Sequence, residues 1–361
     1  MYKHSTVVNN TLYVDGIDRL DLSRSCACGQ SFRWHEDNGG FTAPALGRVV
    51  HARQAGDTLS IYPCAEGEAA DWIHYFDLER DYAAIEERLS HDEQLKMCIP
   101  CATGIRVFNQ DAFEALITFI ISANNNIGRI AGIVERLCAL CGERAELDGK
   151  EYFLFPKPDA IAAREESELL AIGAGYRAPY IIKSARRIAE GYGLEKLRDM
   201  PLDAARKELL TFYGVGPKVA DCVLLFGLGH TDAFPVDVWI GRALSEIYFG
   251  GEKARRQETE RAIRALGSES GIVQQYIFHY ARQNAIGKKQ NAKKIGKKGE
   301  TVVDTGTDAS FAQPKSSTSI AAASTAQSVL SMVVMLFILH KNVILFQAPC
   351  LALLYGNTSA R

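Results

Sequence analysis

The distribution of hydrophobic and polar residues divides the chain into regions of different character. In residues 11–63, short apolar runs alternate with polar residues and are separated by turn signals such as HEDNGG and QAGD. This pattern predicts an antiparallel sheet of four to six strands. From residue 68 to residue 287 most apolar residues recur at helical spacing. We therefore expect an α+β protein in which an antiparallel sheet domain with a flanking helix, residues 1–108, precedes an all-helical domain, residues 109–287.

Several helices of the second domain are marked clearly. Residues 111–123 (DAFEALITFIISA) are apolar nearly all round, which predicts a buried central helix. A helix follows from residue 127, with Gly142 as its C-cap. Residues 209–227 hold the turn between two further helices, and the last helix of the domain is expected within residues 269–287.

The composition changes at residue 288. A lysine run and a Ser/Thr/Ala-rich stretch predict a disordered linker. The apolar run VLSMVVMLFIL that follows has eleven residues, whereas a membrane span needs about 18 or more. We therefore expect a disordered tail and no membrane anchor. A transmembrane helix and a misread gene end are the alternatives for this segment.

The charge of the chain is unevenly distributed. Residues 288–361 hold nine Lys and Arg against three Asp and Glu, whereas the first 287 residues carry a net charge of −8. A nucleic-acid partner of this body would have to be held by a local basic surface. The nine cysteines are an odd number, and the opening MYKHSTVVNN does not look like a secretory signal. These features predict reduced thiols in an intracellular protein.

The sequence FYGVGPKVAD, residues 212–221, predicts a helix that ends near Tyr213, a tight Gly-Val-Gly turn, and a second helix that starts at Pro217. Gly214 and Gly216 permit close backbone approach, and Pro217 is favoured at the first position of a helix. The free N–H groups at that helix start, with the positive end of the helix dipole, can bind a phosphate. Such a helix-hairpin-helix holds the DNA backbone without reading the bases. An ordinary corner between two helices is the alternative.

Lys218 and Asp237 are the candidate catalytic residues. Lys218 is the second residue of the predicted helix, where the dipole and apolar neighbours disfavour an ammonium group. A neutral amine is a nucleophile that forms Schiff bases, whereas a solvated surface lysine is the alternative. Asp237 is the predicted N-cap of a helix that starts at Val238. A fixed carboxylate there can stabilise positive charge on a sugar ring, although most N-cap aspartates only cap.

These residues together resemble a superfamily of DNA glycosylases that is defined by a helix-hairpin-helix, a Gly/Pro-rich loop and an aspartate. Within it, GVGPKVADC and PVDV are similar to the catalytic hairpin and aspartate of the 8-oxoguanine DNA glycosylase family. The blocks GQSFRW, SANNNIGRI, GYRAPYI and QQYIF follow in that family's order. The resemblance covers residues 10–287 and implies a TBP-like sheet domain followed by a helix-hairpin-helix glycosylase domain.

The resemblance implies that the enzyme flips an oxidised guanine out of the duplex and excises it. Lys218 would attack C1′ and form a Schiff base that permits β-elimination, and Asp237 would support the cationic sugar. The carbonyl of Gly29 would accept the N7–H that distinguishes 8-oxoguanine from guanine. The other residues implied in base recognition are Cys222, Gln274 and Phe278.

The resemblance also implies two groups of DNA-binding residues. Those expected at the unpaired cytosine and within the duplex are Asn124, Arg129, Tyr176 and Arg177. Those expected at the phosphate-binding hairpin are Gly214, Val215, Gly216 and Val219. Cytosine is the expected partner of the lesion because two arginines are available for it. A core aromatic or a polar helix end is the alternative reading at Tyr176, at Phe278 and in the asparagine run.

No cofactor is implied. Iron–sulfur relatives carry four clustered cysteines after the catalytic region, whereas only Cys350 follows the predicted hairpin helix. A monovalent or divalent cation at the hairpin is compatible with the resemblance, and a zinc site from Cys98, Cys101, Cys138 and Cys141 is a minor alternative. The expected partner is double-stranded DNA with oxidised guanine. We expect a monomer without an obligate protein partner, located with the DNA in a bacterial cytoplasm or a nucleus.

Two other functions fit the same residues. One is a glycosylase of the same fold that removes alkylated or other damaged bases with water as the nucleophile. Members of that kind usually lack the lysine, so Lys218 argues against it. The other is a non-catalytic module that binds damaged DNA. It predicts no excision, and binding that does not change in Asp237→Asn.

Overall fold

The computed structural model describes residues 1–252 and 255–284, and the structural statements below refer to these residues. The chain divides into two units, residues 1–300 and 301–361, and all described residues belong to the first. The tail predicted for residues 288–361 lies outside the described residues. Among the residues that the structure describes, no helix combines the length and the apolar composition that crossing a membrane requires.

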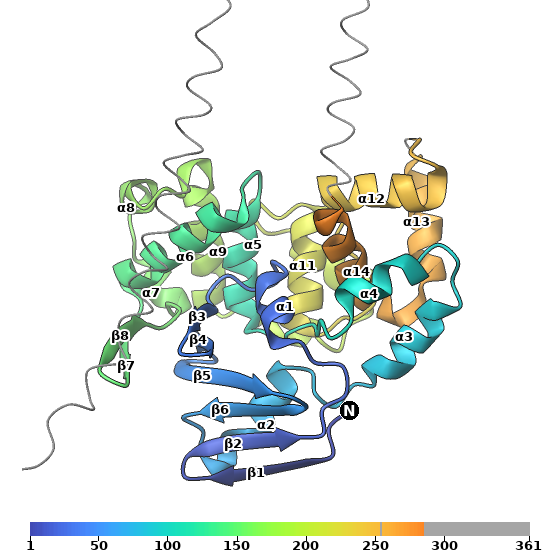
Figure 1. Cartoon of the computed structure of the whole chain (residues 1–361). Coiled ribbons are helices and arrows are strands. Elements are labelled where there is room, and N and C mark those ends of the chain that lie inside the picture. Colours follow the sequence, from blue (N-terminus) through green and yellow to red (C-terminus); the bar gives the residue numbers. More distant parts are fainter. Residues whose placement is uncertain (253–254, 285–361) are drawn as a thin grey trace, which may run out of the picture. The chain divides into compact units, whose positions relative to one another are not determined.

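The amino-terminal part forms the expected antiparallel sheet (Figure 1), with the strand order β1-β2-β6-β5-β4-β3. In β2, Leu12 and Val14 are fully buried and Tyr13 between them is exposed, which is the period-two alternation of a strand with one covered face. Asn9 and Asn10 both have positive φ, as a two-residue hairpin turn requires. The strands are β1 (His4–Val8), β2 (Thr11–Asp15), β3 (His35–Asp37), β4 (Gly40–Ala45), β5 (Arg48–Ala55) and β6 (Thr58–Tyr62).

The rest of the described chain is mainly helical, as predicted. The α-helices are α1 (Leu22–Ala27), α2 (Ala69–Tyr75), α3 (Tyr82–Ser90), α4 (Ile99–Ala102), α5 (Ala112–Ser122), α6 (Ile127–Cys141), α7 (Pro158–Ala162), α8 (Glu166–Ala171), α9 (Ala178–Ala189), α10 (Leu202–Leu209), α11 (Pro217–Leu228), α12 (Val238–Phe249), α13 (Arg256–Ala265) and α14 (Ser270–Gln283). Short 3-10 turns are η1 (Glu66–Glu68), η2 (Lys96–Cys98), η3 (Gly175–Arg177), η4 (Glu195–Leu197) and η5 (Gly267–Glu269).

Helices α5 and α11 form the centre of the helical part (Figure 1). Nine of the eleven residues of α5 are buried, so the predicted central helix is confirmed. Gly227 lets α11 approach α5 closely, because a Cβ at this position would lie 2.9 Å from the Cβ of Ala115. This close packing fixes the amino-terminal end of α11 relative to the carboxy-terminal end of α5.

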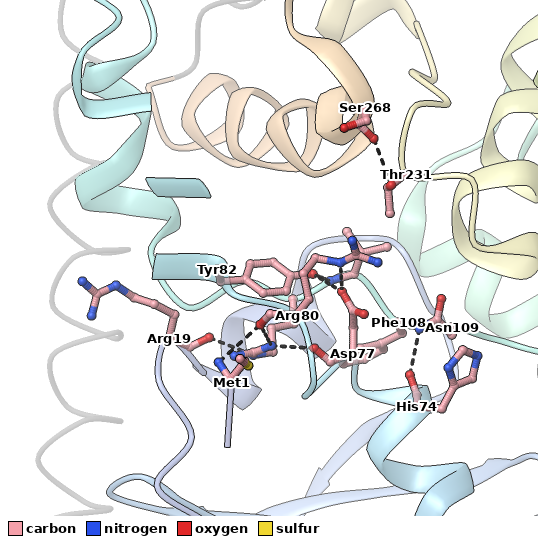
Figure 2. A network of polar contacts seen from close by, with 12 residues as sticks. Met1, Arg19, His74, Asp77, Arg80, Tyr82, Phe108, Asn109, Thr231 and Ser268 are labelled. Carbon is pink, nitrogen blue, oxygen red and sulfur yellow. Dashed lines mark hydrogen bonds and ion pairs between the residues drawn. The ribbon is translucent and has the colours of Figure 1, made fainter. Parts of the chain in front are cut away.

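A buried arginine fastens the sheet to the helical part. Arg106 is fully buried and stacks at 4.4 Å on the ring of Tyr82. Its guanidinium donates to the carbonyl oxygens of Arg19 at 2.9 Å and Asp77 at 2.5 Å. The side chain of Asp77 in turn accepts from Tyr82 Oη at 2.9 Å and Arg80 Nε at 2.7 Å (Figure 2). The network therefore ties the loops around residues 19 and 77 to the segment that leads into α5.

Two hydrophobic cores lie on either side of this joint. One lies at the sheet and extends from Leu12 to Phe108. The other fills the helical part and also takes in residues 82–105 together with Cys28 and Phe32. Residues 82–105 thus pack with the helices although they precede residue 109. The boundary between residues 108 and 109 stays a prediction.

A β-hairpin interrupts residues 109–287, which we predicted to be all-helical. Strands β7 (Arg144–Leu147) and β8 (Lys150–Phe153) pair antiparallel. Asp148 and Gly149 between them both have positive φ, which is the geometry of a two-residue Asp-Gly turn. Local turn chemistry therefore decides the conformation here, and the Asp-Gly pair was the signal for it.

The first helix of the predicted helix pair ends earlier than expected. We placed its end near Tyr213, whereas α10 ends at Leu209. The following residues form a tighter turn, in which the Phe212 N–H donates to the carbonyl of Leu209 at 3.0 Å. The predicted start of α11 at Pro217 and that of α12 after Asp237 are confirmed.

Candidate functional site

The turn between α10 and α11 has the geometry that the two glycines predict. Gly214 has a φ of +78°, and a Cβ there would lie 2.6 Å from Cδ2 of Tyr180, so only glycine fits without strain. Gly216 is the N-cap of α11 and supplies no side-chain hydrogen bond to the helix start. The first N–H groups of a helix have no acceptor within it. Those of Lys218 and Val219 are therefore suited to an anion.

An ion pair holds the two helices of the hairpin together. Arg206 Nε on α10 lies 2.6 Å from Asp221 Oδ1 on α11. Burial raises the pKa of Asp221 to about 6, although the guanidinium of Arg206 acts in the opposite direction. The pair fixes α11 one turn after Lys218, and it also keeps the buried carboxylate of Asp221 partnered.

The side chain of Lys218 is held by the end of α5. Its Nζ donates to Ser122 Oγ at 3.0 Å and lies 5.0 Å from the ring centre of Phe119. The residue is half-buried. The amine is thus neither extended into solvent nor paired with a carboxylate in the contacts that the structure gives it. This disfavours the reading of Lys218 as an ordinary surface lysine.

Cys222 follows Lys218 by one helical turn. Burial raises the pKa of the Cys222 thiol to about 11, Lys218 acts to lower it, and Asp221 and Asp237 act to raise it. Asp237 accepts a hydrogen bond from Ile240 N at 2.8 Å, which confirms its predicted role as the N-cap of α12.

Gly29 and Phe278 meet although they are far apart in the sequence. Gly29 has a φ of +84°, and a Cβ there would lie 3.7 Å from Cε1 of Phe278 on α14 and 3.2 Å from Cδ1 of Ile127 on α6. Gln274, one turn before Phe278, is buried and donates to the carbonyl of Pro235 at 3.1 Å. Helix α14 thus spans from the Gly29 loop to the segment that carries Asp237.

Gln30 fixes the backbone at Gly29. Its side chain is fully buried, and its Nε2 donates to the carbonyls of Ser25 and Arg106, each at 2.8 Å. Its Oε1 accepts from Phe108 N, also at 2.8 Å. The amide therefore uses both of its ends to attach the Gly29 loop to the strand-like segment before α5. A rigid backbone is what a carbonyl needs if it is to recognise a ligand.

Asn124, Tyr176 and Arg177 form one cluster at the end of α5. Asn124 has a φ of +49°, and its Nδ2 donates to Tyr176 Oη at 3.2 Å. Arg177 is buried, stacks at 4.4 Å on Tyr176 and donates to the carbonyl oxygens of Ala123 and Asn124. In this arrangement Arg177 holds the turn that presents Asn124. A direct role of Arg177 at a base stays a prediction.

The remaining predicted residues differ in exposure. Arg129 is exposed near the start of α6, where its N–H donates to the N-cap Asn126 at 3.0 Å. Val215 and Val219 are buried, so they support the hairpin through packing and can offer a ligand only their backbone. Large apolar residues that are 37% to 66% exposed also lie among the predicted site residues or close to them in the chain. They are Ile127, Tyr176, Tyr213, Val236 and Val238.

A large cavity of about 1240 Å³ has Lys218 in its lining. It runs between the amino-terminal ends of α11 and α12 and helix α13, and Pro217, Lys218 and Val238 are among its lining residues. Gly29, Cys222, Gln274 and Phe278 do not line it. The cavity therefore includes Lys218 but not the residues predicted to hold the base.

Sequence reasoning missed three residues that contact the predicted site. Ser122 and Phe119 hold the amine of Lys218, and Ile127 packs against Gly29. All three lie in or next to the segments DAFEALITFIISA and SANNNIGRI that were singled out, but nothing in the sequence says that the end of α5 reaches α11. Across residues 1–252 and 255–284, no three His, Cys, Asp or Glu side chains come together as metal ligands.

The chain matches two family models that together span its body. Residues 15–116 match the amino-terminal domain of 8-oxoguanine DNA glycosylase. Residues 117–269 match the HhH-GPD superfamily of base excision DNA repair proteins. The first model contains Gly29, and the second contains the hairpin, Lys218 and Asp237.

Individual proteins show the same similarity. A probable N-glycosylase/DNA lyase from Methanothermobacter thermautotrophicus is 35% identical over 301 residues, which are 74% of this chain and 95% of that protein. The N-glycosylase/DNA lyase of Saccharomyces cerevisiae is 32% identical over 257 residues, 63% of this chain and 68% of that protein. The structure of Clostridium acetobutylicum 8-oxoguanine glycosylase/lyase, in complex with double-stranded DNA containing cytosine opposite 8-oxoguanine, has a TM-score of 0.76 and 36% identity. The match covers 79% of this chain and 99% of that structure.

Proposed function

The chain belongs to the 8-oxoguanine DNA glycosylase family of N-glycosylase/DNA lyases, and from this premise we propose that it excises 8-oxoguanine from double-stranded DNA and then nicks the strand. The observation that carries the proposal is the placement of Lys218. It starts a helix behind a Gly-Val-Gly turn, and Ser122 and the ring of Phe119 hold its amine.

The reaction begins with the flipped nucleotide next to Lys218. The amine attacks C1′, the bond from C1′ to the base nitrogen breaks, and the departing base takes the electron pair and a proton. The nitrogen then gives up a proton and the C1′–O4′ bond breaks, with its electron pair and a proton going to O4′, which leaves a protonated Schiff base between the lysine nitrogen and C1′. Removal of a C2′ proton then expels the 3′ phosphate by β-elimination. The carboxylate of Asp237 stabilises the positive charge that develops on the sugar.

Recognition of the base uses residues from three separate helices or loops. The carbonyl of Gly29 accepts the N7–H of 8-oxoguanine, whereas guanine would present an acceptor there. Phe278 stacks on one face of the base and Cys222 lies against the other. Gln274 bonds the Watson–Crick edge. To do so, Gln274 must release either the hydrogen bond from its Nε2 to the carbonyl of Pro235 or the one that its Oε1 accepts from Gln275.

The opposite strand and the backbone use the other predicted residues. Asn124 and Arg129 address the unpaired cytosine, Tyr176 enters the duplex, and Arg177 supports both through the turn at Asn124. The backbone N–H groups of Lys218 and Val219 bind a phosphate. We propose that the protein acts as a monomer in the compartment that holds the DNA, and that it needs no metal for the chemistry. A cation at the hairpin is compatible with this proposal.

The proposal is tested by reductive trapping. Wild type is incubated with a duplex that contains 8-oxoguanine opposite cytosine in the presence of borohydride, and the covalent complex is counted. Lys218→Gln is expected to trap none. Lys96→Gln removes an exposed lysine that pairs only with Glu93 at 2.6 Å, and it should trap as wild type does. Trapping by wild type that is no better than trapping by Lys218→Gln would refute the lysine mechanism.

The two alternative functions predict different outcomes. A glycosylase for alkylated bases would excise them without nicking the strand and without a trapped complex. A non-catalytic module would bind the duplex and leave the base in place. A panel of 8-oxoguanine, alkylated and undamaged duplexes, analysed with and without alkaline cleavage of abasic sites, separates all three.

A further inference from the structure

We propose that Ser122 is a positioning residue for Lys218, with a hydroxyl that turns the lone pair of the amine toward the sugar of the flipped nucleotide. This inference rests on the proposed function. It assigns a role to a residue at the end of α5 that lies in the block SANNNIGRI but was given no role by the sequence patterns or the family resemblance.

The hydrogen bonds of Ser122 have a definite direction. Its Oγ donates to the carbonyl of Phe119 at 2.7 Å and receives Lys218 Nζ at 3.0 Å. A hydroxyl has a single hydrogen and two lone pairs. Since that hydrogen is bound to the carbonyl, Ser122 can only accept from Lys218. A neutral amine held in this way donates one N–H to Ser122, and its lone pair points elsewhere.

Phe119 completes the placement of the amine from the same helix. Its ring centre is 5.0 Å from Lys218 Nζ. The ring itself is fixed, because it stacks on Phe226 at 5.4 Å and contacts the edge of Phe32 at 6.1 Å. The last turn of α5 therefore meets Lys218 with one acceptor and one apolar face. The amine has little freedom on these two sides.

The packing of the helices sets the distance between the two side chains. Gly227 at the far end of α11 brings this helix against Ala112 and Ala115 of α5. Ser122 and Lys218 lie at the opposite ends of these helices, where Ser122 Oγ and the ring of Phe119 contact the amine. A nucleophile must be placed to well within 1 Å, and a misplacement of this size can cost about 100-fold in rate.

The test separates the acceptor from the shape of the side chain. Ser122→Thr keeps a hydroxyl. Valine has the shape of threonine but no hydroxyl, so the comparison of Ser122→Thr with Ser122→Val isolates the hydrogen bond. Ser122→Ala is the simple deletion. Ser184→Ala is the control, because Ser184 is likewise a helical serine, it is buried, and its Oγ has no hydrogen-bond partner. Each protein is first checked for wild-type circular dichroism.

Two quantities are measured with duplexes that carry cytosine opposite the modified position. The first is the single-turnover rate of excision of 8-oxoguanine, and of trapping by borohydride. The second is the affinity for a duplex with a tetrahydrofuran abasic analogue, which has no base to excise. A positioning residue affects the rate and leaves the affinity alone.

We expect Ser122→Val and Ser122→Ala to lose about 10- to 100-fold in single-turnover rate while their affinity for the abasic analogue changes by less than about twofold. Ser122→Thr should stay within about threefold of wild type, and Ser184→Ala should match wild type. If Thr and Val variants are equally slow, or if rate and affinity fall together, the inference is wrong. If wild type itself neither excises nor traps, the proposed function fails and takes this inference with it.

Discussion

Replacing Gly214 by alanine should disrupt the hairpin that carries Lys218. Gly214 has a φ of +78°, and an alanine in this left-handed region costs about 1–2 kcal/mol. Its Cβ would also lie 2.6–2.9 Å from three carbon atoms of Tyr180. Overpacking of this kind adds about 1–3 kcal/mol. We therefore expect a loss of about 3 kcal/mol in the free energy of unfolding.

Gly216 provides the control two residues along the chain. Its φ is −96°, which any residue adopts, and a Cβ there would meet no heavy atom within 4 Å. Gly216→Ala changes only the N-cap of α11 and should cost about 1 kcal/mol or less. The two variants thus add the same methyl group to the same turn, in strained and in open surroundings.

Urea unfolding followed by circular dichroism measures both variants. Gly214→Ala should lower the midpoint clearly more than Gly216→Ala, with an unchanged m-value. In a double-mutant cycle, Tyr180→Ala should offset at least about 1 kcal/mol of the loss caused by Gly214→Ala, after its own cost is subtracted, because it removes two of the three atoms that the methyl group meets and leaves only Cβ. Equal midpoints for the two alanine variants, or no rescue by Tyr180→Ala, would refute this account of the hairpin.

Three further predictions concern the pH dependence, the base pocket and the tail. Burial raises the pKa of Glu114 to about 7, with Asp111 and Glu135 adding to the rise and Arg33 opposing it, so the folded protein keeps this proton where the unfolded chain has lost it. This contribution to stability is complete below pH 4.5 and is lost as the pH rises to 7. The contribution amounts to at most about 3 kcal/mol. Urea titrations at several pH values should therefore show that the difference in free energy of unfolding between wild type and Glu114→Gln changes between pH 4.5 and pH 7. A difference that does not depend on pH would contradict this prediction. Gly29→Ala places a methyl group 3.2 Å from Ile127 and 3.7 Å from Phe278, and it should reduce excision of 8-oxoguanine at least about tenfold with little change in affinity for abasic DNA; equal losses of both would indicate a general folding defect. Truncation after Gly287 should leave excision unchanged, because the matched family models end at residue 269; an inactive truncation that is folded and soluble would show that the tail takes part.

The sequence by itself determined the features that depend on neighbouring residues. The Gly-Val-Gly-Pro turn, the helix start that includes Lys218 and the N-cap at Asp237 follow from backbone freedom and from hydrogen bonds within a few residues. The alternation in β2 and the apolar helix α5 follow from which side chains avoid water. The β7–β8 hairpin is also encoded locally, by its Asp-Gly turn, although the helical periodicity of this region predicted helices instead.

Only the tertiary structure decided which of these residues meet. Ser122 and Lys218 are 96 residues apart in the chain and 3.0 Å apart in space, and Gly29 lies beside Phe278 from the last described helix. Such contacts depend on how closely α5, α11 and α14 pack, and the periodicity of apolar residues does not specify the distance between helices. The same holds for Arg177, whose position in the sequence predicts a side chain that contacts DNA. The packing of η3 against the end of α5 buries its guanidinium among backbone carbonyls instead. A local pattern states what a residue can do, but the partners that each side chain finds are set by packing between elements distant in sequence.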